Sequence, residues 1–153
     1  MRRVDQWLTE YGESHRHPTN KRLHWICVPV IVWCVIALLW SVPTGGRWHA
    51  FLNFGVLAAA AALAYYALLS APLALGALPI LLAMIASLPI IEHSRLAPVW
   101  HAAVVLFVLA WIGQFIGHKI EGKRPSFLKD ILFLLIGPLW LLADVYRRLG
   151  IRY

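Results

Sequence analysis

The sequence has 153 residues, of which 61% are hydrophobic and only 14% are charged, and its mean hydropathy is +0.70. Soluble domains contain roughly 45–50% apolar residues, so this composition excludes an ordinary soluble protein and indicates a single integral membrane domain over residues 1–153. The net charge of +7 does not indicate nucleic acid binding. The basic residues flank apolar segments, where anionic lipid headgroups and orientation in the membrane explain them.

The polar N-terminal region predicts two helices separated by a break. Residues 4–14 fit a short amphipathic helix. Pro18 disfavours helix for the residue before it, so a second helix is expected to begin at Thr19 or Asn20, either of which can cap it. In that helix Asn20 and His24 lie one turn apart on the same face.

Four apolar segments follow, at about residues 25–42, 51–69, 73–91 and 99–117. Each is long enough to cross a hydrocarbon core of roughly 30 Å, and Pro- or Gly-containing turns separate them. Four spans return the chain to the side on which it started. The alanine tract 58–62 permits close helix packing within or between chains, so an oligomer is compatible with the sequence.

The last apolar stretch, at about residues 127–145, is interrupted at Gly137-Pro138. Its uninterrupted part has about thirteen residues, too few to span comfortably. We therefore expect a C-terminal re-entrant or interfacial helical hairpin that bends at this pair, with a fifth span as the alternative. The predicted fold is an all-α membrane bundle of four transmembrane helices, an N-terminal amphipathic helix and this hairpin.

Basic residues are distributed unevenly between the two sides of this bundle. The loops opposite the N-terminus offer only Arg47 and Arg95. By the positive-inside rule, the N-terminus and the segment after the fourth span face the cytoplasm. The basic residues on that side are Arg2, Arg3, Arg16, Lys21, Arg22, Lys119, Lys123 and Arg124.

The two cysteines, Cys27 and Cys34, lie in one apolar segment. Seven residues of helix separate their positions by about 10 Å along the axis, which is too far for a disulfide. We predict that both are buried free thiols.

Three of the seven histidines are candidate metal ligands, because His15, His24 and His118 are expected on the same side of the membrane. A single histidine at this depth is explained more simply by hydrogen bonds to lipid headgroups. Three neutral imidazoles that converge indicate a metal site, and they suit Fe(II), Zn or Mn. The polar neighbours expected to orient the rings are Asn20, Gln114 and Glu121.

The remaining histidines are weaker candidates. His17 adjoins the predicted break at Pro18 and is expected to face solvent. His49, His93 and His101 fall on or near the opposite side, beside Glu92. They could form a second metal site, but the polarity of the loops explains them more simply.

Two groups of motifs resemble a known family, the small membrane dioxygenases of the yeast 2-hydroxy fatty acid type. These motifs occupy about residues 11–29 and 114–144, whereas the middle of the chain fits any helical bundle. The matching residues are Tyr11-x3-His15-x4-Asn20-x3-His24 and Pro29, then Gln114-Phe-x-Gly117-His118, Lys123-Arg124-Pro125, and Gly137-Pro138 with Asp144.

The resemblance implies an Fe(II)-dependent, 2-oxoglutarate-independent enzyme of fatty-acid α-oxidation. Such an enzyme uses dioxygen to shorten a 2-hydroxy fatty acid by one carbon and releases CO2. His15, His24 and His118 would carry the iron, and the acyl tail would lie between helices. The cations expected to neutralise the substrate's headgroup are Lys21, Arg22, Lys123 and Arg124.

Two positions depart from that family's pattern. The acid after the Gly-His pair comes one residue earlier here, so Glu121 is expected beside the ligand set and not in it. Asp144 stands where relatives have glutamate, and its shorter side chain reaches less far. The fourth ligand therefore stays open.

Two other classes of function remain compatible with the sequence. One is a different membrane metalloenzyme that acts on lipids, either a hydroxylase or a zinc hydrolase. The other is a non-enzymatic scaffold or small-solute carrier. The sequence contains no Gly-rich phosphate loop and no Gly-x-Ser-x-Gly elbow, so nucleotide binding and serine hydrolase chemistry lose their support.

Overall fold

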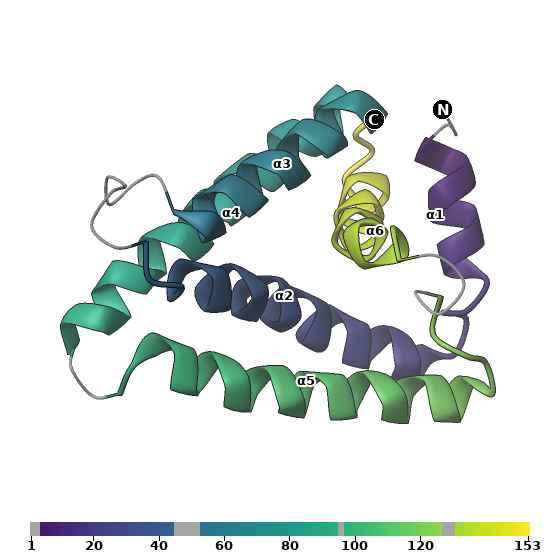
Figure 1. The fold of residues 1–153 in the computed structure, drawn as a ribbon. Helices are drawn as coiled ribbons and strands as arrows, with labels where there is room; N and C mark the ends of the chain where they lie inside the picture. The colour runs from purple at the N-terminus through teal and green to yellow at the C-terminus, as the bar shows by residue number, and fades with distance from the viewer. Residues whose placement is uncertain (1–3, 45–52, 95–96, 127–130) are drawn as a thin grey trace.

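The computed structural model describes residues 4–44, 53–94, 97–126 and 131–153, and every regular element in these ranges is a helix. The predicted all-α class is therefore confirmed. Helices α2 and α5 lie side by side, α3 and α4 form a second pair, and α1 lies beside α6 (Figure 1). The helices are α1 (Val4–Gly12), α2 (Pro18–Trp40), α3 (Phe54–Leu69), α4 (Ala71–Ser94), α5 (Val99–Glu121) and α6 (Phe133–Arg148).

Three of the four predicted spans are helices long and apolar enough to cross a membrane, namely α2, α4 and α5. The remaining predicted span, the second along the chain, corresponds to α3. This helix has 16 residues and is about 24 Å long at 1.5 Å per residue, which is shorter than a typical hydrocarbon core. It begins late because Asn53 caps it, accepting a hydrogen bond from the Val56 amide at 3.0 Å. Residues 51 and 52 of the predicted second span lie outside the described residues. The structure thus supports three spans by length and not the predicted four.

Helix α2 begins earlier than predicted. Thr19 and Asn20 were expected to cap it, but the helix starts at Pro18, and the cap is His17, whose side chain accepts a hydrogen bond from the Thr19 amide at 3.2 Å. Proline suits the first helical position because its fixed φ fits and its missing N–H is not needed there. The break before Pro18 is therefore a short link between α1 and α2.

Helix α2 packs most extensively against α5, and two glycines of α5 make the close approach possible. A Cβ on Gly113 would lie 2.7 Å from the Cys27 Sγ, and one on Gly117 would clash with the Asn20 Oδ1. Small residues four apart on a helix let two backbones approach closely. Cys27 and Cys34 are buried free thiols, as predicted.

Replacing Gly117 with alanine is expected to destabilise the α2–α5 pair. Asn20 is fully buried, so the added methyl group must displace it, and overpacking of this kind costs about 1–3 kcal/mol. Thermal unfolding in detergent measures the change. In the matched variant Gly113→Ala the obstacle is the end of one thiol side chain, so a smaller loss is expected. A Gly117→Ala protein as stable as the wild type would contradict this account of the packing.

Helix α6 runs without interruption through Gly137 and Pro138, so the predicted hairpin with a bend at this pair is wrong. Pro138 lies in the second turn, where its missing N–H removes one backbone hydrogen bond, and tertiary packing compensates. Trp7 of α1 stacks edge-on against Phe133 with ring centroids 5.3 Å apart, and the Tyr66 hydroxyl donates to the Leu135 carbonyl at 2.8 Å. In place of the predicted hairpin, the segment forms one continuous helix of 16 residues.

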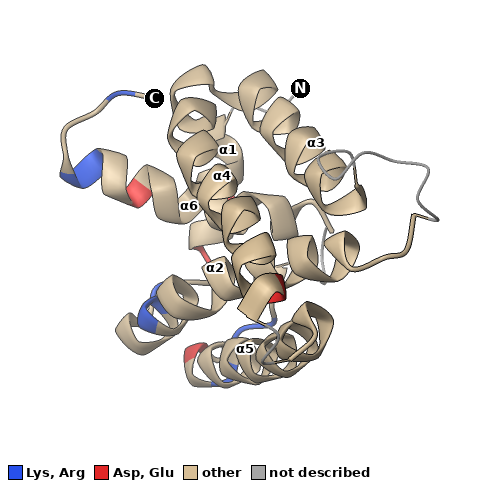
Figure 2. Ribbon diagram, turned by 90° about the vertical axis from the view of Figure 1, so that its left-hand side faces the viewer, with Lys and Arg blue, Asp and Glu red and all other residues tan. Residues whose placement is uncertain are grey.

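The basic residues gather in three places (Figure 2). Among the described residues every lysine and arginine lies at the start of α2, at the end of α5, or at the end of α6. The Arg148 guanidinium lies 5.8 Å from the ring of Trp25, which brings the end of α6 close to the first turns of α2. These residues are Arg16, Lys21, Arg22, Lys119, Lys123, Arg124, Arg147, Arg148 and Arg152.

Candidate metal centre

The start of α2 and the end of α5 lie together, and three histidines meet there. His15 lies in the link before α2, His24 in the second turn of α2, and His118 in the last turn of α5. Their exposed fractions are 1%, 1% and 5%, and one ring nitrogen of each lies within 4.8 Å of those of the other two. The structure thus brings together the three histidines that the sequence singled out.

Hydrogen bonds fix which nitrogen of two rings carries the proton. The His15 Nδ1 lies 2.6 Å from the Tyr11 carbonyl oxygen, and the His24 Nδ1 lies 3.0 Å from the Asn20 carbonyl oxygen. A carbonyl oxygen only accepts, so each Nδ1 must be the N–H donor. In the neutral rings the Nε2 atoms then carry lone pairs and no hydrogen.

The two Nε2 atoms nevertheless lie only 2.8 Å apart. Two facing lone pairs repel unless a proton or a cation lies between them or beside them. Nitrogens bound to one metal at about 2.0–2.1 Å are about 3 Å apart when the angle at the metal is near 90°. The spacing and the tautomers therefore fit a shared metal ion.

His118 completes the donor set. Its Nδ1 is buried and has no hydrogen-bond partner among the described residues, although buried polar atoms are almost always paired. Within the described ranges no other group of histidine, cysteine or carboxylate side chains has the spacing of a metal site. The three imidazoles fit a divalent transition metal and leave positions free for other ligands.

Burial keeps the His15 ring neutral. Removal from water lowers the pKa of His15 from 6.5 to about 4, because a buried charge is poorly solvated. The Tyr11 ring stacks on it with centroids 4.1 Å apart, and burial also raises the pKa of the Tyr11 phenol. At neutral pH the imidazole is thus available as a ligand and the phenol holds its proton.

The lowered pKa of His15 predicts that the metal-free protein loses stability in acid. The unfolded chain takes up the proton first, so the free energy of unfolding falls as the pH drops from about 6.5 to about 4, by up to roughly 3 kcal/mol. Denaturant titration at several pH values measures this slope. The His15→Gln variant should show a shallower slope, and equal slopes would contradict the prediction.

Glu121 holds the two histidine-bearing segments together. Its carboxylate accepts hydrogen bonds from the backbone amides of Arg16 at 2.9 Å and His17 at 2.7 Å, and from the Asn20 Nδ2 at 3.2 Å. Asn20 also donates to the Ser14 carbonyl at 3.0 Å. The carboxylate therefore satisfies amides at the start of α2, where a negative charge is favourable, and it lies beside the histidines.

A cavity of about 50 Å³ adjoins the three histidines. Gln114, predicted from the sequence, is buried and lines it. Two further polar residues on its wall, Tyr11 and Ser126, were not among the predicted site residues, although Tyr11 belongs to the motif that resembles the family. The Ser126 hydroxyl is buried without a hydrogen-bond partner among the described residues. The spacing of Tyr11 and His15, one helical turn, was the available signal for the first, whereas nothing local marks the second.

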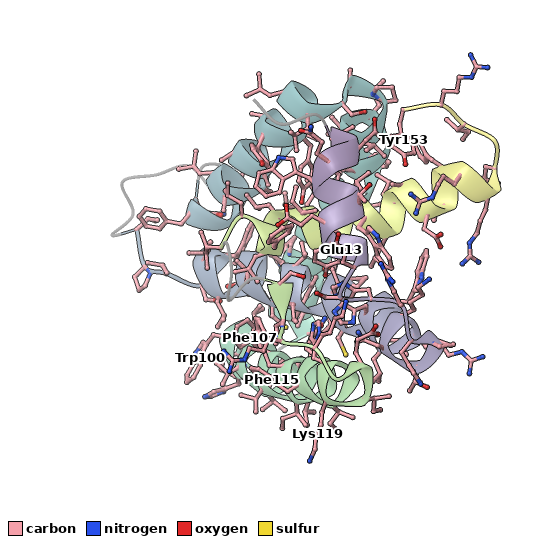
Figure 3. All side chains as sticks on the ribbon, turned by 90° about the vertical axis from the view of Figure 1, so that its right-hand side faces the viewer. Glu13, Trp100, Phe107, Phe115, Lys119 and Tyr153 are labelled. Carbon is pink, nitrogen blue, oxygen red and sulfur yellow. The ribbon has the colours of Figure 1, made fainter. Side chains whose placement is uncertain are left out.

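The four cations predicted to bind the headgroup are all exposed, and they differ in position. Arg124 lines a second, polar cavity of about 330 Å³, which shares Ser126 and Phe133 with the histidine cavity. The Lys123 ammonium donates to the Glu13 carbonyl at 2.7 Å. Lys21 and Arg22 line neither cavity. Lys119, next to His118, points away from the bundle (Figure 3).

The other candidates lie apart from this cluster. His93 is exposed, with its Nδ1 2.7 Å from the Pro89 carbonyl oxygen, and His101 is exposed against the ring of Trp100. His49 lies outside the described residues. Asp144 pairs with Arg148 at 2.8 Å. In the described part of the chain, neither the opposite-side histidines nor Asp144 belongs to a metal-binding group.

Comparison with known proteins matches this chain to a family. A model of the family described as 2-hydroxy-palmitic acid dioxygenase Mpo1-like matches residues 1–149. The chain belongs to this family. The Mpo1-like match covers every helix described above and all three clustered histidines, so the resemblance inferred from the motifs is confirmed.

A named relative supports the same assignment. The 2-hydroxy-palmitic acid dioxygenase MPO1 of Saccharomyces cerevisiae is 26% identical over 142 residues, which make up 92% of this chain and 78% of the yeast protein. No solved structure matches the chain. The family's description and the yeast relative's name are both those of a dioxygenase.

Proposed function

We propose that this protein is an Fe(II)-dependent dioxygenase that shortens 2-hydroxy fatty acids by one carbon and releases CO2. Membership of the Mpo1-like family supports the substrate class. The facing Nε2 atoms of His15 and His24, 2.8 Å apart and buried, carry the argument for a metal. They have no role as a hydrogen-bonded pair, because both rings already donate through Nδ1.

Iron is the metal that suits both the donor set and the reaction. Imidazole ligands accommodate Fe, Zn, Cu and Ni. The need for redox chemistry with dioxygen excludes zinc, and the family resemblance favours iron among the redox-active metals. When bound, Fe(II) supplies the redox chemistry with dioxygen and a positive charge for the substrate's carboxylate and 2-hydroxyl.

The chain's own residues then divide the remaining work. The carbonyls of Tyr11 and Asn20 hold the rings of His15 and His24 in the tautomer that leaves each Nε2 free, and these two nitrogens would bind the metal. The buried amide of Gln114 lies on the cavity wall, where it can donate to a substrate oxygen. Apolar residues of α2 and α6 on the same wall exclude water.

Arg124 is the predicted cation best placed for the headgroup. It lines the polar cavity that meets the histidine cavity at Ser126. There its guanidinium would attract the substrate carboxylate and offset the Glu10 and Glu13 carboxylates that line the same cavity, and the unpaired Ser126 hydroxyl would offer a hydrogen bond. Lys21, Arg22 and Lys123 lie on the surface nearby and would attract anionic headgroups more generally.

The site would face the cytoplasm in a multi-pass membrane protein. All described basic residues lie near the histidine-bearing ends of α2 and α5 or at the end of α6, which is the distribution of a cytoplasmic face. Labelling of a cysteine introduced at exposed Lys119 in inverted and right-side-out vesicles tests this orientation.

Metal analysis combined with oxygen uptake tests the proposed function. The purified protein is expected to contain iron and to consume oxygen with 2-hydroxypalmitate, and the product should be an acid one carbon shorter. Palmitate, which lacks the 2-hydroxyl, serves as the control substrate and should not be consumed. Zinc without oxygen uptake would favour a hydrolase, and a protein without metal would favour a scaffold or carrier; either result would contradict the proposal.

A further inference from the structure

A second, apolar cavity of about 150 Å³ lies between α2, α4 and α6. Trp25 and Pro29 of α2, Ile80 of α4 and Leu142 of α6 are among its lining residues. Tyr66 also lines it, but the Tyr66 hydroxyl is engaged by the Leu135 carbonyl. We call this cavity the apolar groove. It offers hydrocarbon contacts and no free charged group.

The apolar groove adjoins the histidine cavity. Val28 and Val32 of α2 line both. On α6 the histidine cavity is lined by Gly137 and the groove by the next residue, Pro138. A Cβ on Gly137 would lie 2.9 Å from the Tyr11 hydroxyl and 3.7 Å from Val28. Because Gly137 has no side chain, α6 can pass close to Tyr11 and Val28.

The histidine cavity thus lies between two different environments. At Ser126 and Phe133 it meets the polar cavity, which is lined by Arg124 and by Glu10 and Glu13. At Val28 and Val32 it meets the apolar groove. No α4 residue lines the histidine cavity, so the α4 side is the far wall of the groove. A molecule with a polar head and a hydrocarbon tail matches this order of environments, polar on one side and apolar on the other.

We propose that the apolar groove binds the acyl chain of the substrate, while its carboxylate and 2-hydroxyl reach the histidine cavity. This inference rests on the proposed function for the identity of the head. Membrane lipid is as apolar as the groove, so the groove adds little affinity. Its role is to hold the chain in one direction so that the head is correctly placed for reaction.

A bulky residue on the far wall tests the groove. Ile80→Trp is expected to lower kcat/KM for 2-hydroxypalmitate by about tenfold, because the displaced chain misplaces the head. Leu82→Trp is the matched control, since Leu82 is exposed on the same helix and does not line the groove. The control should retain wild-type turnover. Equal kcat/KM in Ile80→Trp and Leu82→Trp would overturn the proposal.

Photo-crosslinking tests binding without turnover. A 2-hydroxypalmitate with a mid-chain diazirine is bound to the wild-type protein in nanodiscs under nitrogen, irradiated, and mapped by mass spectrometry. We expect adducts on the segments that line the groove, namely residues 25–32 of α2, Tyr66, residues 77–84 of α4 and residues 138–145 of α6. Unlabelled 2-hydroxypalmitate should abolish these adducts, and excess phosphatidylcholine should not. Adducts elsewhere, or equal competition by the phospholipid, would overturn the proposal.

The two experiments separate this inference from the proposed function. Specific adducts in the groove without oxygen uptake would leave the acyl-chain site standing and remove the dioxygenase. Oxygen uptake with adducts only on α5, which contributes no residue to the groove, would keep the dioxygenase and remove the groove as its chain site.

Discussion

Replacing His24 with alanine is expected to abolish metal binding and turnover together. The ring contributes one of the two Nε2 atoms that face each other at 2.8 Å, and alanine leaves His15 without its partner. Loss of a group that only supports a ligand costs about 10–100-fold in metal affinity, so loss of a ligand should exceed about 100-fold. Metal per chain after desalting and oxygen uptake with 2-hydroxypalmitate measure both effects.

The chain offers a matched control for this experiment. His101 is an exposed histidine near the start of α5, at the opposite end from His118, and His101→Ala should keep both metal and activity. His24→Gln tests whether the protein still folds without the imidazole, since its amide can donate to the Asn20 carbonyl. A folded His24→Ala protein that retains metal and turnover would remove His24 from the site.

The meeting of the three histidines could be predicted because it follows from topology. The sequence has four apolar segments up to His118, an even number, which predicts a return to the side of His15; α2 to α5 are four such helices, although α3 is too short to count as a span. An i, i+4 spacing sets Asn20 and His24 on one face. Neither step needs side-chain detail. The ring tautomers could not be predicted, because they depend on the carbonyls of Tyr11 and Asn20 pointing at each Nδ1.

Helix ends were harder to predict because local preferences compete there. Thr19 and Asn20 are good caps by residue type, but Pro18 suits the first helical position, which moves the cap to His17. At Gly137-Pro138 the local rule favours a bend. Packing of α6 against α1 and the hydrogen bond from Tyr66 to Leu135 instead accompany a continuous helix.

Replacing Glu121 with alanine is expected to weaken metal binding without removing a ligand. The carboxylate joins the end of α5 to the amides of Arg16 and His17, so its loss frees the link that carries His15 from the helix that carries His118. The affinity for Fe(II) should fall by about 10–100-fold, as for other groups that support ligands. Saturating metal should restore the wild-type metal content, as measured by titration with Fe(II) under nitrogen.

This result would differ in kind from the loss of a histidine, and the difference decides the role of Glu121. If Glu121 bound the metal itself, Glu121→Ala would lose metal that excess Fe(II) does not restore, as expected for His24→Ala.

Glu121→Gln keeps one amide oxygen as an acceptor for a backbone N–H, so it should retain more affinity than Glu121→Ala. Glu92→Ala, at an exposed carboxylate near the end of α4, should leave the affinity unchanged. The hydrogen bonds from Arg16 and His17 to Glu121 join segments more than a hundred residues apart in the sequence. Glu121→Ala removes these bonds, so it should also destabilise the metal-free fold.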